Sequence, residues 1–341
     1  MLHVDNQTPF GASLFLAPDV TGVDTAWVVV KATFEIGPKS VSVAAAQTPI
    51  VAGDECWGDP KSSSIRYAGE VHPAKPATDV ALVGGGHAPG GRPVPGFGVS
   101  LTVGPLKKVV HVHGDRAWQR GLVGPSISKP APVTEVPLRY ELAYGGRHDL
   151  ANGELLADLR NPVGRGFLGK RSASELIGLP LPNLEHPKQW VTSPGDKPPP
   201  ACFGFIAPWW EPRRRYTGTF DEAWRTTRAP YWPLDLDPRF FQAVPPDQVV
   251  AGGLRGGEPV EIVNASPRGV QRFALPAIEL GVTVRIGREE HRPRLRLETL
   301  LLEPDRDRFS MTWRGGVTCD KRSLRVETAT VTLEALEGVA G

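Results

Sequence analysis

One stretch near the N-terminus alternates strictly between two kinds of side chain, and it limits the chain to folds built from extended strands. In residues 26–36, every second side chain is apolar, while the intervening positions include Lys31, Thr33 and Glu35. A period of two places successive side chains on opposite faces of a β-strand, whereas a helix needs a period near 3.6. The stretch therefore predicts a long strand with one apolar face.

Shorter runs of the same kind follow along the chain, and turn-forming residues separate them. The 341 residues include 38 glycines and 35 prolines, which end strands and interrupt helices. The further runs cover residues 99–103, 108–113, 138–144, 260–263, 270–275, 282–286, 294–302 and 309–313. The sequence therefore predicts a mainly β fold, in which two antiparallel β regions pack in a sandwich-like arrangement.

Helix signals are few. The Thr-x-x-Glu pattern from Thr219 to Glu222 has the spacing of a capping box, and Pro230 ends the stretch that follows. We therefore expect one short helix over residues 220–228. Residues 172–177 predict a second, single helical turn.

The composition divides the chain into three parts. Residues 1–150 and 249–341 contain the predicted strands and form an N-terminal and a C-terminal β region. Residues 151–248 are rich in proline and tryptophan, and a disordered linker would lack so many aromatic side chains. We expect this middle part to be a long ordered loop segment that joins the two β regions and carries function.

Charge and cysteine content argue against several classes of partner. The chain has 39 Lys and Arg residues against 37 Asp and Glu residues, so bulk charge favours neither nucleic acid nor an anionic membrane as a partner. Its apolar runs are too short to span a bilayer, and the first residues lack a secretion signal. The three cysteines show no CxxC spacing. These features are typical of a cytoplasmic protein.

Two motifs resemble sites of known chemistry. Residues 164–170 have the GxxxxGK spacing of a phosphate-binding loop, but Arg171 stands where such a loop needs Ser or Thr. His111 and His113 lie on one face of a predicted strand, without a recognisable third metal ligand. We interpret both motifs as structural and predict no metal, no cofactor and no catalytic residue. The chain is therefore not expected to be an enzyme.

The strongest candidate for a partner-binding site is a cluster of large rings and guanidinium groups in the middle segment. Tyr, Trp and Arg contribute most of the binding energy at many protein interfaces. The alternative is that the rings fill the core and the arginines pair with nearby acids. The candidate residues are Trp209, Trp210, Arg213, Arg214, Arg215 and Tyr216.

Several ordered blocks of the sequence resemble a family of domains of unknown function that are encoded beside bacterial type VI secretion effectors. The blocks are residues 31–34 (KATF), 75–80 (KPATDV), 114–118 (GDRAW), 140–146 (YELAYGG), 161–167 (NPVGRGF), 181–185 (LPNLE), 218–224 (GTFDEAW), 233–237 (PLDLD) and 243–248 (AVPPDQ). Together they span most of the chain.

This resemblance implies a cytoplasmic chaperone or adaptor rather than an enzyme. Such a protein binds a toxic effector and helps to load it onto the secretion spike, through the trimeric spike protein or the PAAR protein at its tip. The resemblance assigns no binding residues. A competing hypothesis is a carbohydrate-binding or carbohydrate-active β-sandwich, because the nine tryptophans offer rings on which sugars stack.

Overall fold

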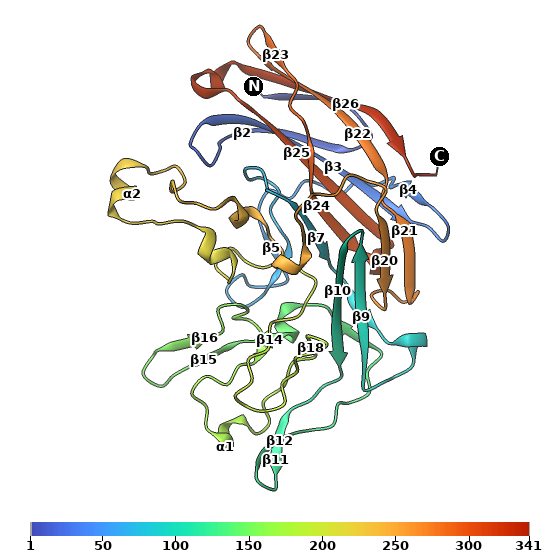
Figure 1. Cartoon of the computed structure of the whole chain (residues 1–341), viewed down its shortest axis with the longest axis vertical. Coiled ribbons are helices and arrows are strands. Elements are labelled where there is room, and N and C mark those ends of the chain that lie inside the picture. Colours follow the sequence, from blue (N-terminus) through green and yellow to red (C-terminus); the bar gives the residue numbers. More distant parts are fainter. Residues whose placement is uncertain (1, 341) are drawn as a thin grey trace.

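The computed structural model describes residues 2–340 and is mainly β, as the alternating pattern predicts (Figure 1). Most of the strand residues lie in three sheets with seven, five and four strands. Side chains from all three sheets contribute to one large hydrophobic core. Within the described residues, no helix is long and apolar enough to cross a membrane.

The seven-stranded sheet is the largest. Its strands follow the order β19-β7-β24-β25-β3-β2, and β4 pairs with β3. The bounds are β2 Gly11–Pro18, β3 Asp24–Ile36, β4 Val41–Val43, β7 Thr78–Leu82, β19 Val249–Val250, β24 Arg296–Glu303 and β25 Arg308–Thr318.

The other two large sheets have the orders β18-β10-β9-β20-β21 and β1-β26-β22-β23. The five-stranded sheet consists of β9 Gly96–Val103, β10 Leu106–His113, β18 Leu184–Glu185, β20 Pro259–Val263 and β21 Val270–Ala274. The four-stranded sheet consists of β1 His3–Gln7, β22 Ala277–Ile286, β23 Glu289–His291 and β26 Val326–Glu337.

The remaining elements are short. Two-stranded ribbons are formed by β5 Glu55–Cys56 with β6 Ile65–Tyr67, β8 Gly85–His87 with β13 Glu135–Pro137, β11 Trp118–Gly121 with β12 Gly124–Ile127, β14 Tyr144–Gly145 with β17 Arg165–Gly166, and β15 Arg147–Asp149 with β16 Leu155–Ala157. The α-helices are α1 Ala173–Leu176 and α2 Glu222–Thr227. The 3-10 helices are η1 Pro89–Gly91, η2 Tyr140–Leu142, η3 Arg213–Tyr216, η4 Pro238–Phe241, η5 Pro246–Gln248, η6 Pro304–Arg306 and η7 Asp320–Arg325.

The two predicted β regions do not form separate sheets. Strand β3 pairs antiparallel with β25, β9 pairs antiparallel with β20, and β1 pairs parallel with β26. Each large sheet therefore combines strands from residues 1–150 with strands from residues 249–341. Side-chain alternation specifies which face of a strand is buried, but it does not specify the partner strand, so it could not predict that strands of the two β regions share sheets.

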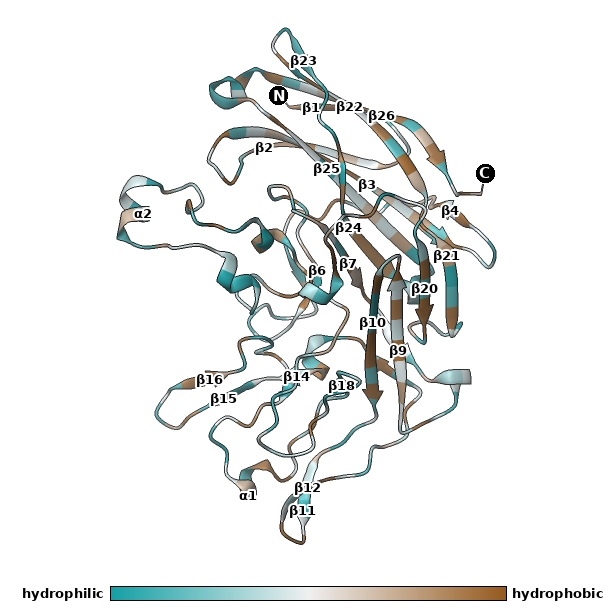
Figure 2. Ribbon diagram, viewed as in Figure 1, coloured by the Kyte–Doolittle hydropathy of each residue, from teal (hydrophilic) through white to brown (hydrophobic). Residues whose placement is uncertain are grey.

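The apolar face of β3 packs against the five-stranded sheet. Phe34 and Phe309 of the seven-stranded sheet stack with ring centroids 5.2 Å apart, and Phe273 of β21 stacks on Phe309 at 5.0 Å. Figure 2 shows predominantly hydrophobic residues along β7, β10 and β20, which contribute to this core. The two sheets form the sandwich-like part of the molecule.

The second face of β3 is also buried, although it carries polar side chains. Lys31 is 3% exposed, and its ammonium group lies 2.8 Å from a carboxylate oxygen of Glu70. Thr312, opposite Lys31 on β25, donates to the other oxygen of Glu70 at 2.7 Å. The loops that cover this face thus supply the charge that a buried lysine requires.

The ion pair of Lys31 is part of a larger set of buried charges, which we call the buried charge network. Arg314 donates through Nε to Glu298 at 2.7 Å and through Nη2 to the main-chain oxygen of Glu70 at 2.6 Å. Lys75 bonds Asp79 at 2.7 Å, and its main-chain N–H donates to Glu298. The three cations and three carboxylates of the network are Lys31, Lys75, Arg314, Glu70, Asp79 and Glu298, so their formal charges balance.

The middle segment is ordered by contacts to the rest of the fold and within itself (yellow-green to orange in Figure 1). Gln248 donates to the main-chain oxygens of Val80 and Phe203, each at 2.7 Å. Arg228, which directly follows α2 (Glu222–Thr227), donates to the main-chain oxygen of Thr21 at 2.7 Å. These hydrogen bonds attach a proline-rich segment to β7 and to the turn between β2 and β3.

The predicted helix over residues 220–228 is present as α2, but its capping residue is not the predicted one. The Asp221 carboxylate accepts the main-chain N–H of Trp224 at 2.8 Å and so caps the helix. Thr219 bonds Asp235 instead, through its hydroxyl at 2.7 Å and its N–H at 3.0 Å. Asp is a strong N-cap residue, and here it is closer to the helix than Thr219. The predicted second turn is α1.

The buried charge network predicts a large difference between two arginine substitutions. Replacing Arg314 by Met leaves Glu298 without its cation, and we expect a loss of about 3–5 kcal/mol in the free energy of unfolding. Arg285 makes an exposed pair with Glu290 at 3.5 Å, so Arg285→Met should cost less than about 1 kcal/mol. Urea denaturation of both variants measures the difference. Equal losses would contradict a structural role for the network.

Candidate partner-binding site

The structure separates the six predicted partner-binding residues into buried and accessible groups. Trp210 is 1% exposed and Arg213 is 7% exposed. Trp209 is 52% exposed, Arg214 and Arg215 are exposed, and Tyr216 is half-buried. All belong to η3 or to the residues just before it, and the second group offers most of the side-chain surface that a partner can reach.

The two buried residues hold the middle segment in place. The ring of Trp210 packs edge-on against Tyr140, with centroids 5.6 Å apart. Arg213 donates to the main-chain oxygens of Ile206 at 2.7 Å and Phe240 at 3.0 Å. For Trp210 the core-filling alternative fits the structure, because nearly full burial leaves little of the ring for a partner.

The accessible residues lie on a segment with several other exposed apolar side chains. Among residues 2–340, four large aromatic side chains are more than a third exposed, and three of these are Trp209, Phe220 and Tyr231. Leu234 of the same segment is 82% exposed. We call residues 209–234 the aromatic segment. Exposed apolar groups in such density are typical of interaction sites.

Charges on the aromatic segment are mostly paired nearby. Arg215 forms an ion pair with Glu211, and Arg225 forms one with Glu222. The Arg239 guanidinium lies over the ring of Tyr216, 4.4 Å from its centroid. Exposed pairs of this kind contribute little to stability and exchange partners readily. They allow an incoming acidic group to bind these arginines.

An apolar groove of about 450 Å³ lies beside the aromatic segment. Its lining includes Arg213, Trp232, Phe240 and Phe241 of the middle segment and Phe15 of β2. Its volume is in the range of small-ligand sites. The groove is lined by residues Phe15, Ala17, Pro18, Ala52, Gly53, Asp54, Ala68, Gly69, Val71, His72, Pro73, Pro208, Arg213, Trp232, Phe240, Phe241 and Ala243.

His72 connects this groove to the buried charge network. Its ring stacks on Phe241 with centroids 5.8 Å apart, and its Nε2 lies 3.4 Å from Nη2 of Arg314. Burial, together with the positive charge of Arg314, holds the pKa of His72 well below its usual value. The ring is therefore neutral at physiological pH.

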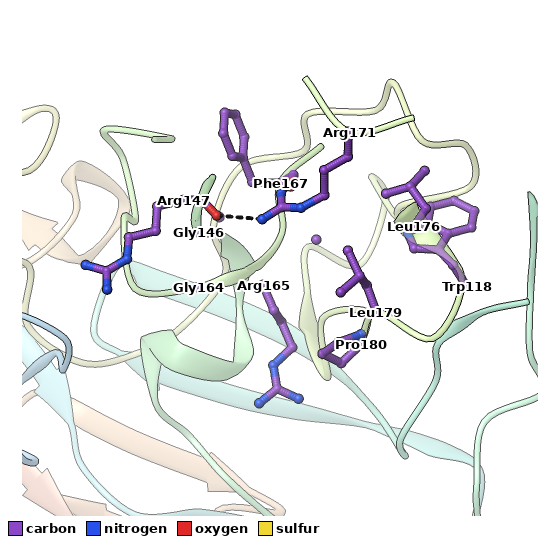
Figure 3. A pocket seen from close by; sticks show the side chains of 12 residues that line it. Trp118, Gly146, Arg147, Gly164, Arg165, Phe167, Arg171, Leu176, Leu179 and Pro180 are labelled. Atoms are coloured by element: carbon purple, nitrogen blue, oxygen red, sulfur yellow. Dashed lines mark hydrogen bonds between the residues drawn. The ribbon is translucent and has the colours of Figure 1, made fainter. Parts of the chain in front are cut away.

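The GxxxxGK loop lines a second, smaller cavity of about 140 Å³ (Figure 3). Arg171 donates to the main-chain oxygens of Phe167 at 2.9 Å and Arg147 at 3.0 Å. Lys170 is exposed and lies 3.5 Å from the carboxylate of Glu154. In a phosphate-binding loop the lysine turns toward the phosphates and a long helix follows, whereas the four-residue helix α1 follows here.

The two histidines of β10 lie under an exposed tryptophan. The Trp190 ring centroid is 4.9 Å from those of His111 and His113. Nε2 of His113 lies 3.0 Å from a buried oxygen of Glu185, and Arg116 donates to the same oxygen at 2.7 Å. Among residues 2–340, the potential ligands His, Cys, Asp and Glu do not gather into a metal-binding group of three. Both imidazole rings pack against Trp190.

One exposed apolar feature was missed in the sequence analysis. Leu122 and Val123 form the two-residue loop of the β11–β12 ribbon and are fully exposed. Gly121 and Gly124 flank them, which is the signal of a tight hairpin turn. The ribbon extends away from the sheets in Figure 1 and presents an apolar tip.

One known protein family matches most of the chain. A model of a bacterial family described as uncharacterized conserved proteins, DUF2169, matches residues 21–314. The chain belongs to this family. No curated protein and no solved structure shows significant similarity to the chain.

In this DUF2169 member, residues from several of the sequence blocks listed above form polar contacts with one another. Lys75 and Asp79, from one block, bond each other. Arg116 of a second block bonds Glu185 of a third. Asn161 of a fourth block is fully buried and donates to the main-chain oxygens of Tyr140 and Tyr144, within a fifth block, at 2.8 and 2.9 Å. These contacts attach loops to the rest of the fold, and they do not indicate what the protein binds.

The adjacent tryptophans give a matched pair of substitutions. Trp210→Ala removes a buried ring and should lower the free energy of unfolding by about 3–5 kcal/mol. Trp209→Ala removes a half-exposed ring and should change it by less than about 1 kcal/mol. Thermal and urea denaturation test both values. A Trp209 variant as unstable as the Trp210 variant would show that Trp209 is part of the core.

The lowered pKa of His72 predicts a pH dependence of stability. In the unfolded chain the ring titrates near about 6.5, so below this pH the unfolded state binds a proton that the folded state does not. The free energy of unfolding should therefore fall as pH decreases from about 7 to about 5. In His72→Gln the decrease should be smaller, by at most about 1.4 kcal/mol per pH unit. Identical slopes in urea melts of the two proteins would contradict this assignment.

Proposed function

We propose that the protein is a cytoplasmic chaperone or adaptor that binds a type VI secretion effector and helps to load it onto the secretion spike. The observation that carries this proposal is the aromatic segment, where exposed rings are held on an ordered scaffold. A surface of this composition is unfavourable in water unless a partner covers it for part of the protein's lifetime.

The rigidity of the segment supports a binding role. Prolines and hydrogen bonds such as that of Arg228 to Thr21 restrict the backbone before a partner arrives. Little conformational entropy is then lost on binding, so more of the contact energy appears as affinity. The rings of Trp209 and Tyr216 supply contact area for the partner, while the guanidinium groups of Arg214 and Arg215 supply hydrogen-bond donors for its acidic groups.

The link to secretion comes from the sequence blocks that resemble proteins encoded beside type VI effectors. The partners of the proposal are therefore an effector encoded nearby and either the trimeric spike protein or the PAAR protein at its tip. The nearly equal numbers of acidic and basic residues agree with a protein partner better than with nucleic acid.

Co-expression with the effector encoded next to the gene tests the proposal. We expect a stable complex and a higher soluble level of the effector. Trp209→Ala or Arg214→Ala should weaken the complex by about 2 kcal/mol, or about thirtyfold, if these residues lie at the centre of the interface. Arg285→Ala, on the four-stranded sheet, is the control and should bind as tightly as the wild type.

Two outcomes would contradict the proposal. Normal binding by folded Trp209 and Arg214 variants would remove the aromatic segment from the interface. Failure to form a complex with any effector or spike protein encoded nearby, combined with binding to a glycan panel, would favour the carbohydrate-binding alternative.

A further inference from the structure

A buried guanidinium group in the wall of the apolar groove lacks a carboxylate partner. Arg213 is 7% exposed and lines the groove. Its Nε and Nη1 donate to the main-chain oxygens of Phe240 and Ile206, and within residues 2–340 it forms no ion pair with a carboxylate. The charge of the group is thus offset by two carbonyl dipoles and, at longer range, by the carboxylates of Asp54 and Asp79.

Such an arrangement is costly unless something else supplies a negative charge. Burial lowers the pKa of Arg213, which reflects the poor solvation of its charge. Every cation of the buried charge network, in contrast, has its own carboxylate. A carboxylate that enters the groove would find donor capacity on Arg213 that the protein does not use.

The two carboxylates that act on Arg213, Asp54 and Asp79, form no ion pair with it, and Asp79 is already paired with Lys75. Asp54 lines the groove but is exposed, and its carboxylate accepts the main-chain N–H of Gly69 at 2.7 Å. His72 is neutral because burial and Arg314 lower its pKa. An exposed charge is screened by water, whereas Arg213 acts in a medium of low dielectric constant, so the net effect at the groove wall is positive.

The rest of the lining is suited to an apolar group. Phe15, Trp232 and Phe240 contribute rings, and the volume of about 450 Å³ accommodates a few large side chains. Arg213 and Trp232 belong to the aromatic segment and also line the groove, so the groove and the exposed side chains of that segment are parts of one surface region. This continuity favours a peptide segment over an isolated small molecule.

We propose that the groove binds a short segment of the effector in which a large apolar side chain adjoins an Asp or Glu. The apolar side chain fills the groove between Phe15 and Trp232, and the carboxylate pairs with Arg213. This inference rests on the adaptor function and specifies the chemistry by which the adaptor selects its partner.

Overlapping 15-residue peptides that tile the neighbouring effector are the probe, and fluorescence anisotropy with the full-length adaptor is the measurement. We expect the peptides that bind to share an acidic residue next to a large apolar one. Changing that acid to its amide should weaken binding about 10- to 100-fold, since a charge-assisted hydrogen bond contributes about 1.5–3 kcal/mol. This substitution is on the peptide, so the adaptor's folding is unaffected.

On the adaptor, Arg213→Met should bind the acidic peptide and its amide counterpart equally weakly. Arg213→Lys keeps the charge and should retain part of the preference for the acid. Arg285→Met is the matched control, because Arg285 is an exposed arginine on the four-stranded sheet that is paired with Glu290 and does not line the groove. It should discriminate between the two peptides as the wild type does.

The outcomes separate this inference from the adaptor function. If the adaptor binds the whole effector but Asp or Glu to amide changes have no effect in any binding peptide, the groove inference is wrong and the adaptor function stands. If neither effector nor peptides bind, the adaptor function itself fails. Self-association that is lost in Arg213→Met would assign the groove to a second copy of the chain and would also overturn the inference.

Discussion

The buried charge network is the constraint on which the architecture depends. A lysine on the longest strand of the largest sheet cannot be buried without a carboxylate, and Glu70, from a covering loop, provides it. Arg314 then joins that loop to Glu298 of β24 through two hydrogen bonds. A buried charge that loses its partner is strongly destabilising. These ion pairs therefore hold loops without regular structure in place over the sheet.

This network also explains how a loop-rich middle segment stays ordered. Asp79 accepts both the ammonium of Lys75 and the main-chain N–H of Ala243, so the network extends into the segment next to the groove. Gln248 and Arg213 continue the pattern, with side chains that donate to main-chain oxygens. Long loops of this kind place functional side chains on a rigid support, which lowers the entropic cost of binding.

Much of the strand content could be predicted from the sequence, but the pairing could not. The alternation in residues 26–36 identifies β3, and α2 lies within the predicted range of residues 220–228. Periodicity, however, contains no information on which strands pair with β3. Strand β3 pairs with its sequence neighbours β2 and β4, but also with β25, which is far away in sequence. The burial of Lys31 was equally unpredictable, because its partner Glu70 is on a loop without a recognisable pattern.

The candidate site shows the same limit at the level of single residues. Trp209 and Trp210 are identical in sequence terms, and only the direction of each side chain makes one accessible and the other part of the core. The same holds for Arg213 and Arg215, which lie on one 3-10 helix: one is buried without a carboxylate, and the other is exposed with one. The fold therefore places three consecutive arginines in two different environments: Arg213 is buried, whereas Arg214 and Arg215 are exposed. The exposed ones are screened and interchangeable, whereas the charge of Arg213 is fixed at one point beside apolar rings, where it can distinguish an acid from an amide.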